Sequence, residues 1–423
     1  MSLTSGLASP RTPLRLFLDR EMSAGPGPLR QTFLASLTRA PIVLPGPGVG
    51  TEAGTVGTAI DQRLRLAFTA ASPVDAATAI GVLEAGGFPV PPLAAAMSDV
   101  GKQLLNLLTE TVDQFRLDDR AHPLPRAQEE EEHLARLLLA AAWYAVAART
   151  MIGFVHTPLF QAVADDPDAF SLGRLLALPN EDMVADVVAQ VFRAAQGDLV
   201  GLRAGTAAAD CVGGPTFPEV NITADADLVV DGLLLEFKSS RHVKVLPQRT
   251  IWQLLGYLLL DHADRYRVDA VGVVQTRTGR LITWPVDTFL ELLGARRRDL
   301  TELREVFAEL LTNCPADLIP YETRKEAVTH GLLTRLAHPT PPGHCWVCAQ
   351  PLPSLRGSRK RAYCSAWCRQ RCDYHRKRGW LQPAPNLNGT TSVPSTAAPP
   401  PALQAPPAHG PSGPAFAGPA AGP

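Results

Sequence analysis

Four charged side chains lie close to an Asp-Gly pair in the middle of this chain. Residues 224–238 read ADADLVVDGLLLEFK, in which Asp-Gly at 231–232 separates two runs of β-forming residues. This setting predicts a two-residue hairpin turn. With that turn, Asp227 lies opposite Glu236 and Asp225 lies opposite Lys238, and alternation puts all four on one face. The other face carries only apolar residues and is predicted to pack on the core: Ala226, Leu228, Val230, Leu233, Leu235 and Phe237.

The charged face has the residue types of a divalent-cation site. Carboxylates directly opposite each other across a strand pair, with Cβ atoms about 5 Å apart, repel each other. The pair is tolerated if one group is protonated, if both are solvated, or if a cation lies between them. Mg²⁺ binds through one or two carboxylates and keeps several waters. Lys238 could then orient or deprotonate a metal-bound water, or offset charge in the transition state, which suits phosphodiester hydrolysis. The alternative is a solvent-facing strand pair that merely carries four charges.

An apolar helix is predicted from Arg249 to about His262, after the hairpin. Gln253 and Tyr257 are four residues apart in it, so they share one face and can point at the same site. An amide and a phenol at the edge of an apolar helix also occur without any function.

These residues together resemble the PD-(D/E)xK nuclease superfamily. Asp227 with Glu236-Phe237-Lys238 resembles the D…(D/E)xK pattern, and Gln253 with Tyr257 resembles the QxxxY signature of the RecB-like branch. The resemblance covers about residues 180–310. It implies an α/β fold with a restriction-endonuclease-like mixed sheet flanked by helices. It also implies a nuclease that depends on Mg²⁺ or Mn²⁺ and acts on DNA.

The same resemblance assigns roles to individual residues. Asp227 and Glu236 would be metal ligands, Lys238 the catalytic lysine, and Gln253 and Tyr257 would position the scissile strand or water. Two further ligands are suggested: the carbonyl of Phe237 and, less directly, the carboxylate of Glu219. Asp225 is a rival to Asp227 for the first ligand position.

Five of the seven cysteines lie between 345 and 372. Cys345-x2-Cys348 and Cys364-x3-Cys368, 15 residues apart, predict one structural Zn²⁺ with four protein ligands. The stretch YCSAWCR at 363–369 resembles one half of treble-clef-like zinc fingers. Cys372 and His375 are spare ligands that could instead group with the second cysteine pair.

The cysteine module is strongly basic. Residues 344–381 hold nine Lys and Arg and one acid, whereas the whole chain has 40 Lys and Arg against 41 Asp and Glu. Aromatic residues at 367, 374 and 380 lie among these cations, a mixture that suits phosphate contact and base stacking. We therefore expect DNA as the partner, with single-stranded DNA or RNA as further possibilities. A solvated basic surface or a protein-binding knuckle is the alternative.

The remaining pattern predicts the elements that position these residues. Helices are expected over 100–117, 127–151, 180–196 and 286–311, with strands over 270–275 and 281–285. Residues 1–95, rich in Pro, Gly and Ala, are expected to hold short helices. The order of helices and strands past residue 180 favours an α/β domain around a small mixed sheet.

Length and composition predict the domain organisation. The 423 residues are expected to form a mainly helical region (1–179), a nuclease-like domain (180–335), a basic zinc module (344–381) and a disordered Pro/Ala/Gly-rich tail (382–423). The N-terminus lacks the pattern of a signal peptide, and the longest uncharged apolar helical stretch, residues 137–148, is too short to span a bilayer. A cytoplasmic location is expected. The absence of a GxxxxGK[ST] loop argues against an ATP-driven helicase within this chain.

The sequence thus predicts a metal-dependent DNA nuclease with a zinc module that assists nucleic-acid binding. The alternatives are a catalytically silent nucleic-acid-binding protein and a protein that binds other proteins through its zinc module.

Overall fold

The computed structural model describes residues 3–7, 12–37, 40–217, 224–297 and 299–313, with 343–345, 351–352, 362–363 and 369 near the cysteine module. The chain divides into two compact units, Met1–Val328 and Thr329–Pro423. The described part of the first unit is mixed α/β, with a helical N-terminal region followed by a five-stranded mixed sheet and its helices. The predicted tail, 382–423, lies outside the described residues.

The sheet contains the predicted hairpin. Its strands follow the chain order: β1 (Cys211–Gly213), β2 (Leu228–Val230), β3 (Leu233–Lys238), β4 (Ala270–Gln275) and β5 (Arg280–Pro285). Neighbouring strands are antiparallel except β3 and β4, which are parallel. Val229 pairs with Leu234, so the predicted register is confirmed. Asp231 and Gly232 both have positive φ, 44° and 78°, as a type I′ turn requires.

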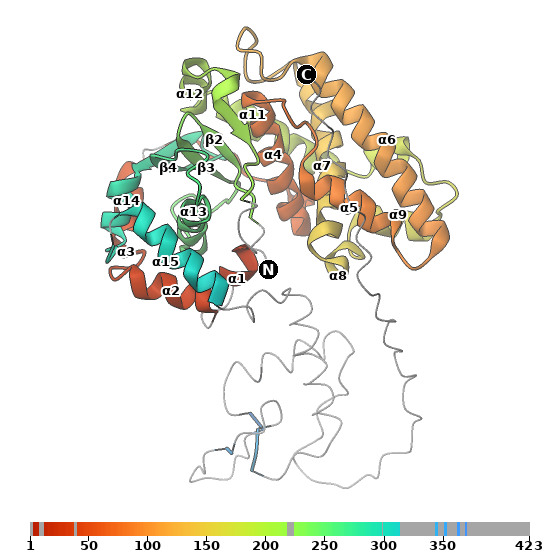
Figure 1. Ribbon diagram of the computed structural model, residues 1–423. Helices are drawn as coiled ribbons and strands as arrows, with labels where there is room; N and C mark the ends of the chain where they lie inside the picture. Colours follow the sequence, from red (N-terminus) through yellow and green to blue (C-terminus); the bar gives the residue numbers. More distant parts are fainter. Residues whose placement is uncertain are drawn as a thin grey trace, which may run out of the picture. The chain divides into compact units, whose positions relative to one another are not determined.

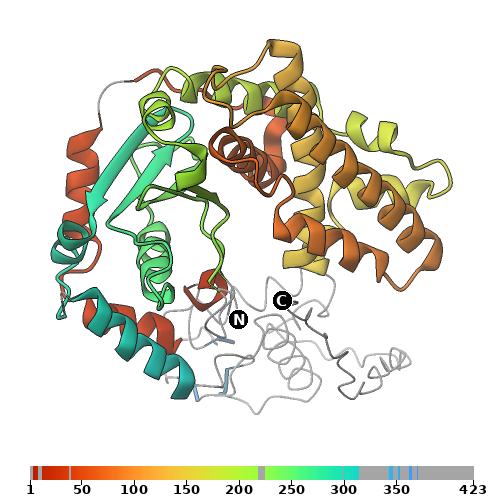
Figure 2. The ribbon, with the colours of Figure 1, turned by 45° about the horizontal axis from the view of Figure 1, so that its top comes forward.

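Helices cover both faces of this sheet (Figure 1). One face packs on α13 (Gln248–Leu260), together with α14 (Val286–Leu292) and α15 (Leu300–Asn313). The other face packs on α4 (Ala53–Phe68), α11 (Glu181–Ala194) and α12 (Leu199–Gly205). Figure 2 shows the same layers with the top of the molecule turned towards the viewer.

The prediction that only one hairpin face belongs to the core is therefore wrong. Val229 and Leu234, on the charged face, are 3% and 1% exposed and belong to the core around α13. Ala226 was expected on the opposite face but joins the same core, because the chain leaves the regular strand before β2 begins. The charged residues consequently lie at the end of an apolar face that is itself buried.

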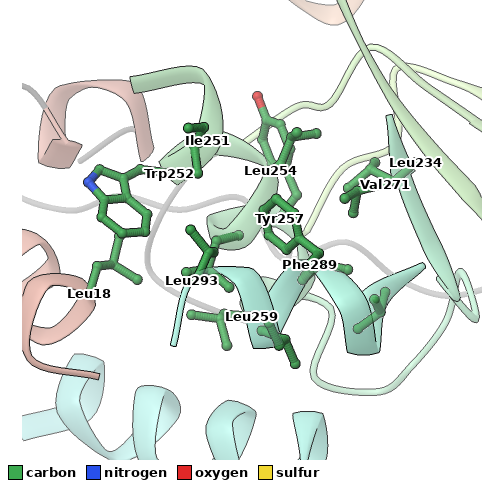
Figure 3. Packing of buried hydrophobic residues seen from close by; sticks show 14 of the residues in the cluster. Leu18, Leu234, Ile251, Trp252, Leu254, Tyr257, Leu259, Val271, Phe289 and Leu293 are labelled. Atoms are coloured by element: carbon green, nitrogen blue, oxygen red, sulfur yellow. The ribbon is translucent and has the colours of Figure 1, made fainter. Parts of the chain in front are cut away.

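The first residues of the chain belong to the core of the sheet. Three helices pack on the α13 side: α1 (Leu3–Leu7), α2 (Pro13–Glu21) and α3 (Gly27–Ser36). Figure 3 shows Leu18 of α2 beside Trp252 of α13, and Leu234 of β3 beside Val271 of β4. Residues 1–179 therefore supply parts of both helical layers as well as the separate helical core.

The helical core lies beyond α4 and α11. It is formed by the helices α5 (Ala76–Gly86), α6 (Pro91–Phe115), α7 (Gln128–Arg149), α8 (Met151–Phe154), α9 (Pro158–Asp165) and α10 (Leu172–Ala177). The outward sides of α4 and α11 pack into this core through residues such as Val56 and Val187. Two 3₁₀ turns, at Pro47–Glu52 and Ala208–Asp210, complete the described elements.

Most predicted elements are confirmed within a few residues. The helices expected over 127–151 and 180–196 match α7 and α11, and Asn180 caps α11 by accepting from the Met183 amide. The helical stretch expected over 286–311 is not one continuous helix. It is split into α14 and α15, because Gly294 adopts a φ of +67° that ends the first helix. In the described part of the chain, no helix is both long and apolar enough to cross a membrane.

Candidate active site at the end of strand β3

Asp227 lies at the point where the first hairpin strand leaves its partner. The Ala226 amide donates to Pro215 O (3.1 Å) and the Gly214 amide donates to Asp227 O (3.0 Å), so the backbone here is bonded on the β1 side. The ladder with β3 ends at the Leu228–Leu235 pair. Beyond it, Asp227 Oδ2 accepts from the Phe237 amide at 2.6 Å and so replaces the missing strand partner.

This contact also orients the carbonyl of Phe237. In a strand, the N–H and C=O of one residue point to the same side. The Phe237 carbonyl therefore faces the side occupied by Asp227. It was suggested as a further metal ligand, and its direction agrees with that role.

Glu236 and Lys238 lie on the same face of β3. Glu236 is 4% exposed, and its Oε1 accepts from Lys238 Nζ at 2.5 Å. Glu236 Oε2 is buried and has no hydrogen-bond partner among the described residues. Leaving a buried acceptor unsatisfied costs about 1–3 kcal/mol, and more for a charged group. This oxygen is therefore poised for a ligand that brings positive charge.

Asp227 is largely buried close to other carboxylates, and its ionised form is therefore disfavoured. Burial raises the pKa of Asp227 well above its usual value, and the neighbouring carboxylates of Asp61 and Glu236 raise it further. Asp227 and Glu236 are not ladder partners, but they are close enough to repel each other. The raised pKa means that Asp227 takes up a proton more readily than an ordinary aspartate, and a proton or a cation there would relieve this repulsion.

Lys238 keeps its proton. Burial alone would lower the pKa of Lys238, but the carboxylates of Glu236 and Asp227 outweigh that effect and raise it. At neutral pH the side chain is therefore an ammonium group. It can donate hydrogen bonds and offset negative charge, but it is not a base.

Helix α4 adds two residues that the sequence analysis missed. Arg65 Nε donates to Asp61 Oδ1 at 2.9 Å, and a second guanidinium nitrogen also contacts that carboxylate. Arg65 Nη2 lies 3.9 Å from Asp227 Oδ1. Burial disfavours the charged guanidinium, but Asp61 and Asp227 outweigh this and raise the pKa of Arg65. An i,i+4 Asp–Arg pair was visible in the sequence, but nothing local indicated that it would lie against a hairpin about 160 residues later.

Tyr257 and Gln253 lie on the α13 side of the site. Tyr257 is 4% exposed and stacks on Phe217, with ring centroids 5.7 Å apart and planes at 11°. Burial raises the pKa of Tyr257, and the carboxylates of Glu236 and Asp227 raise it further, while its hydrogen bond with Gln253 opposes them. The structure therefore brings Tyr257 into the field of the acids. Figure 3 shows Tyr257 projecting from α13 among the core residues.

Asp225 takes a different position from the one predicted. The expected pairing of Asp225 with Lys238 is wrong, because β2 starts only at Leu228 and Asp225 instead forms an isolated bridge with Thr216. Asp225 is exposed, whereas Asp227 contacts β3 directly. Of the two rivals, Asp227 is the one placed against Glu236. Glu219 lies outside the described residues.

The end of β3 is held in place from α11. Gln190 Oε1 accepts from Ser239 Oγ at 2.9 Å and from Thr276 Oγ1 at 2.6 Å. The Thr276 amide donates to Lys238 O at 3.2 Å. These contacts fix the backbone on which Lys238 is mounted.

A buried ion pair reinforces this anchor. Arg277 donates two hydrogen bonds to Asp186 of α11, at 2.7 and 2.8 Å, and a third to Ser239 O at 2.9 Å. The side chains of Arg277 and Asp186 are 2% and 0% exposed. The pair therefore ties the ends of β3 and β4 to the helix that covers them.

The carboxylates present suit an ion that keeps most of its waters. No group of three or more His, Cys, Asp or Glu side chains in metal-binding arrangement occurs among the described residues. An ion at Asp227 and Glu236 would therefore rely on two carboxylates, water and backbone oxygen. That donor set fits Mg²⁺ or Mn²⁺ better than a closed zinc site.

Little of the predicted zinc module is described. His344 and Pro351 form an antiparallel bridge, and the Leu352 amide donates to Gly343 O at 2.7 Å, so the chain on the two sides of the first cysteine pair comes together. Cys345 within it is buried. The other predicted ligands, Cys348, Cys364 and Cys368, and the spare ligands at 372 and 375, lie outside the described residues.

Comparison with known proteins adds no relative. No protein-family model matches the chain, and neither a curated protein nor a solved structure is significantly similar to it.

Proposed function

We propose that this protein is a nuclease that depends on Mg²⁺ or Mn²⁺ and hydrolyses phosphodiester bonds of DNA. Its sheet and flanking helices would then be a restriction-endonuclease-like core. The observation that carries the proposal is the buried Oε2 of Glu236, which has no partner in the described structure, beside Asp227 with its raised pKa. A divalent ion would satisfy the first group and replace the proton on the second.

Asp227 and Glu236 would hold the ion, with the carbonyl of Phe237 as a further donor on the same side. The bound ion would lower the pKa of a coordinated water and neutralise charge on the phosphate. In hydrolysis, the water oxygen bonds to phosphorus and the bond to the leaving sugar oxygen breaks. That oxygen takes up a proton as the water gives one up.

The protein's own groups would contribute position and charge. Lys238, held as an ammonium group by Glu236, would orient the attacking water or offset charge on the phosphate oxygens. Its raised pKa favours these roles over proton abstraction. Tyr257 stays protonated because of its own raised pKa, so it would donate a hydrogen bond to the scissile strand or to water.

The cysteine module would assist by holding nucleic acid. Its nine Lys and Arg side chains and the aromatic residues that lie among them, at 367, 374 and 380, support this role. Zinc would be structural there, with all four positions filled by protein.

Cleavage assays test the proposal directly. Full-length protein is incubated with plasmid and with single-stranded DNA in Mg²⁺, in Mn²⁺ or in EDTA. The variants Glu236→Gln and Lys238→Met are compared with Glu110→Gln and Lys102→Met, which change the same residue types on the exposed side of α6. We expect cleavage only with a divalent ion, and losses of about 100-fold or more for the first pair alone.

Two outcomes contradict the proposal. Protein that cleaves no substrate with either ion would be a silent nucleic-acid-binding or protein-binding molecule. Equal cleavage by wild type and by the Glu236 and Lys238 variants would assign any nuclease activity to another site or to a contaminant.

A further inference from the structure

The segment that follows Lys238 carries exposed positive charge. Residues 239–249, which lead from β3 into the first turn of α13, include Arg241, Lys244 and Arg249, all exposed, and His242 beside them. No Asp or Glu occurs anywhere between Glu236 and Asp261. We call residues 239–249 the basic loop.

Among the described residues, the three cations have no acidic partner. Arg241, Lys244 and Arg249 form no ion pair with any described residue; Arg241 contacts only the ring of His242, at 3.4 Å. Some exposed cations elsewhere in this unit are paired, whereas others, such as Arg149 and Arg265, form no ion pair with a described residue either. Arg20, Lys102 and Arg116 each lie against an acid, at 3.0, 3.7 and 2.8 Å.

The backbone of the basic loop is held although its charged side chains are not. Near its start, Ser239 O accepts from Arg277, and Gln275 donates to Val243 O. Near its end, Leu246 is buried and its carbonyl accepts from Arg30 Nε at 3.0 Å. The loop backbone is therefore fixed, and it presents to solvent three cations that no described acid neutralises. Such an arrangement lowers the ordering cost of binding a polyanion.

The basic loop directly follows Lys238 in the chain, and this position favours a nucleic-acid strand as the polyanion. At no more than about 3.4 Å per residue, Arg241 lies within about 10 Å of Lys238 along the chain, and Lys244 within about 20 Å. Those distances correspond to about three and six nucleotides of one strand, at 3.4 Å per nucleotide. A strand cleaved beside Lys238 would extend over this range. Arg249 also favours a bound anion. It lies in the first turn of α13, where the helix dipole disfavours a cation unless an anion lies nearby.

We propose that the basic loop binds the sugar–phosphate backbone of the nucleic-acid strand on one side of the scissile bond. This inference rests on the proposed function and extends it. It means that the first compact unit has its own nucleic-acid affinity and does not depend entirely on the cysteine module for it.

The test measures binding without cleavage. A fluorescein-labelled mixed-sequence oligonucleotide, single-stranded or duplex, is titrated with full-length protein in EDTA over a range of KCl concentrations. The loop variant Arg241→Gln/Lys244→Gln/Arg249→Gln is compared with wild type. The control Arg20→Gln/Lys102→Gln/Arg116→Gln removes the same net charge from paired, exposed positions.

Each phosphate contact contributes about 0.7–0.9 to the slope of log Kd against log salt concentration. We therefore expect the loop variant to lose about 2–3 from that slope, with affinity more than tenfold weaker near 0.1 M salt. The control should keep the wild-type slope within about one contact. Melting temperatures in EDTA should be unchanged for both variants, because only exposed side chains are altered.

Three results would overturn the inference. These are an unchanged slope in the loop variant, equal slope changes in both variants, and a loss of binding to phosphatidylserine vesicles while oligonucleotide binding stays intact. The last would assign the loop to an anionic membrane. Failure of the proposed function looks different. If the protein binds nucleic acid through the basic loop but cleaves no substrate, the proposed nuclease activity is wrong, whereas the proposed role of the loop is supported.

Discussion

At the scale of single residues, the site combines groups that are unfavourable together. Asp227, Glu236 and Asp61 gather their negative charges within a largely buried space, with Arg65 and Lys238 as partial compensation. Such crowding destabilises the folded protein, and groups with perturbed pKa values are concentrated at functional sites. Here the function would be the binding of a divalent ion by Asp227 and Glu236.

This crowding predicts a gain in stability when Asp227 loses its charge. The pKa of Asp227 is raised in the folded protein above its usual value of 3.8. The contribution of Asp227 to the free energy of unfolding is therefore fully present below pH 3.8, where the group is protonated. It is lost as pH rises through the pKa of the folded protein. Asp227→Asn keeps an acceptor for the Phe237 amide but removes the ionisation. In EDTA at neutral pH, we expect a higher melting temperature for this variant than for wild type.

The pH dependence and added metal provide the controls. The advantage of Asp227→Asn should shrink as pH falls towards 4 and should shrink also when Mg²⁺ is added, because the ion stabilises only the ionised site. Thermal unfolding from pH 4 to 8, with and without Mg²⁺, measures both effects. A variant less stable than wild type in EDTA at pH 7 would contradict this account of the charges.

At the scale of elements, the site depends on how α11 holds the ends of β3 and β4. The carboxylate of Asp186 neutralises Arg277 in a fully buried position, and Arg277 in turn supports the backbone directly after Lys238. A buried pair of this kind contributes little net stability, but removing one partner leaves an uncompensated charge.

We therefore expect Asp186→Ala to destabilise the protein by about 3–5 kcal/mol in free energy of unfolding. Asp165→Ala removes the acid of an exposed pair with Arg174, and we expect it to cost less than about 1 kcal/mol. Urea unfolding measures both. Because Asp186→Ala could prevent folding altogether, the double variant Asp186→Leu/Arg277→Met is included. It should recover much of the lost stability, and no recovery would show that the charge pair is not the cause.

At the scale of the whole molecule, a compact unit with the candidate catalytic site is followed by a basic cysteine module in the same chain. If the module holds one zinc ion, its metal should be separable from the metal used in cleavage. The two proposed sites differ in donor chemistry, with thiolates in one and carboxylates in the other.

We expect purified wild-type protein to contain one zinc ion per chain, and Cys345→Ser/Cys348→Ser protein to contain much less. Cleavage by the variant should still require Mg²⁺ or Mn²⁺, while its affinity for DNA falls and becomes less dependent on salt, because phosphate contacts are lost. Elemental analysis and oligonucleotide titration measure these effects. Cys211→Ser is a control, since Cys211 lies on the sheet. If both variants and wild type contain the same amount of zinc, Cys345 and Cys348 are not zinc ligands.

Local sequence chemistry determined the hairpin and most of the helices. Asp-Gly at 231–232 specified the turn and, with it, the register that aligns Val229 with Leu234. Asn180 marked the start of α11 by its capping contact. These features follow from the preferences of a few neighbouring residues, which is why they could be predicted without any knowledge of the rest of the chain.

Only the tertiary structure decided what surrounds the hairpin. Both of its faces are covered, α1–α3 pack on the α13 side, and α4 brings Asp61 and Arg65 to Asp227. A helix such as α4, apolar on two sides, is equally compatible with several partners in isolation. Its partner is chosen by the packing of segments more than 100 residues apart, and no local preference encodes that choice.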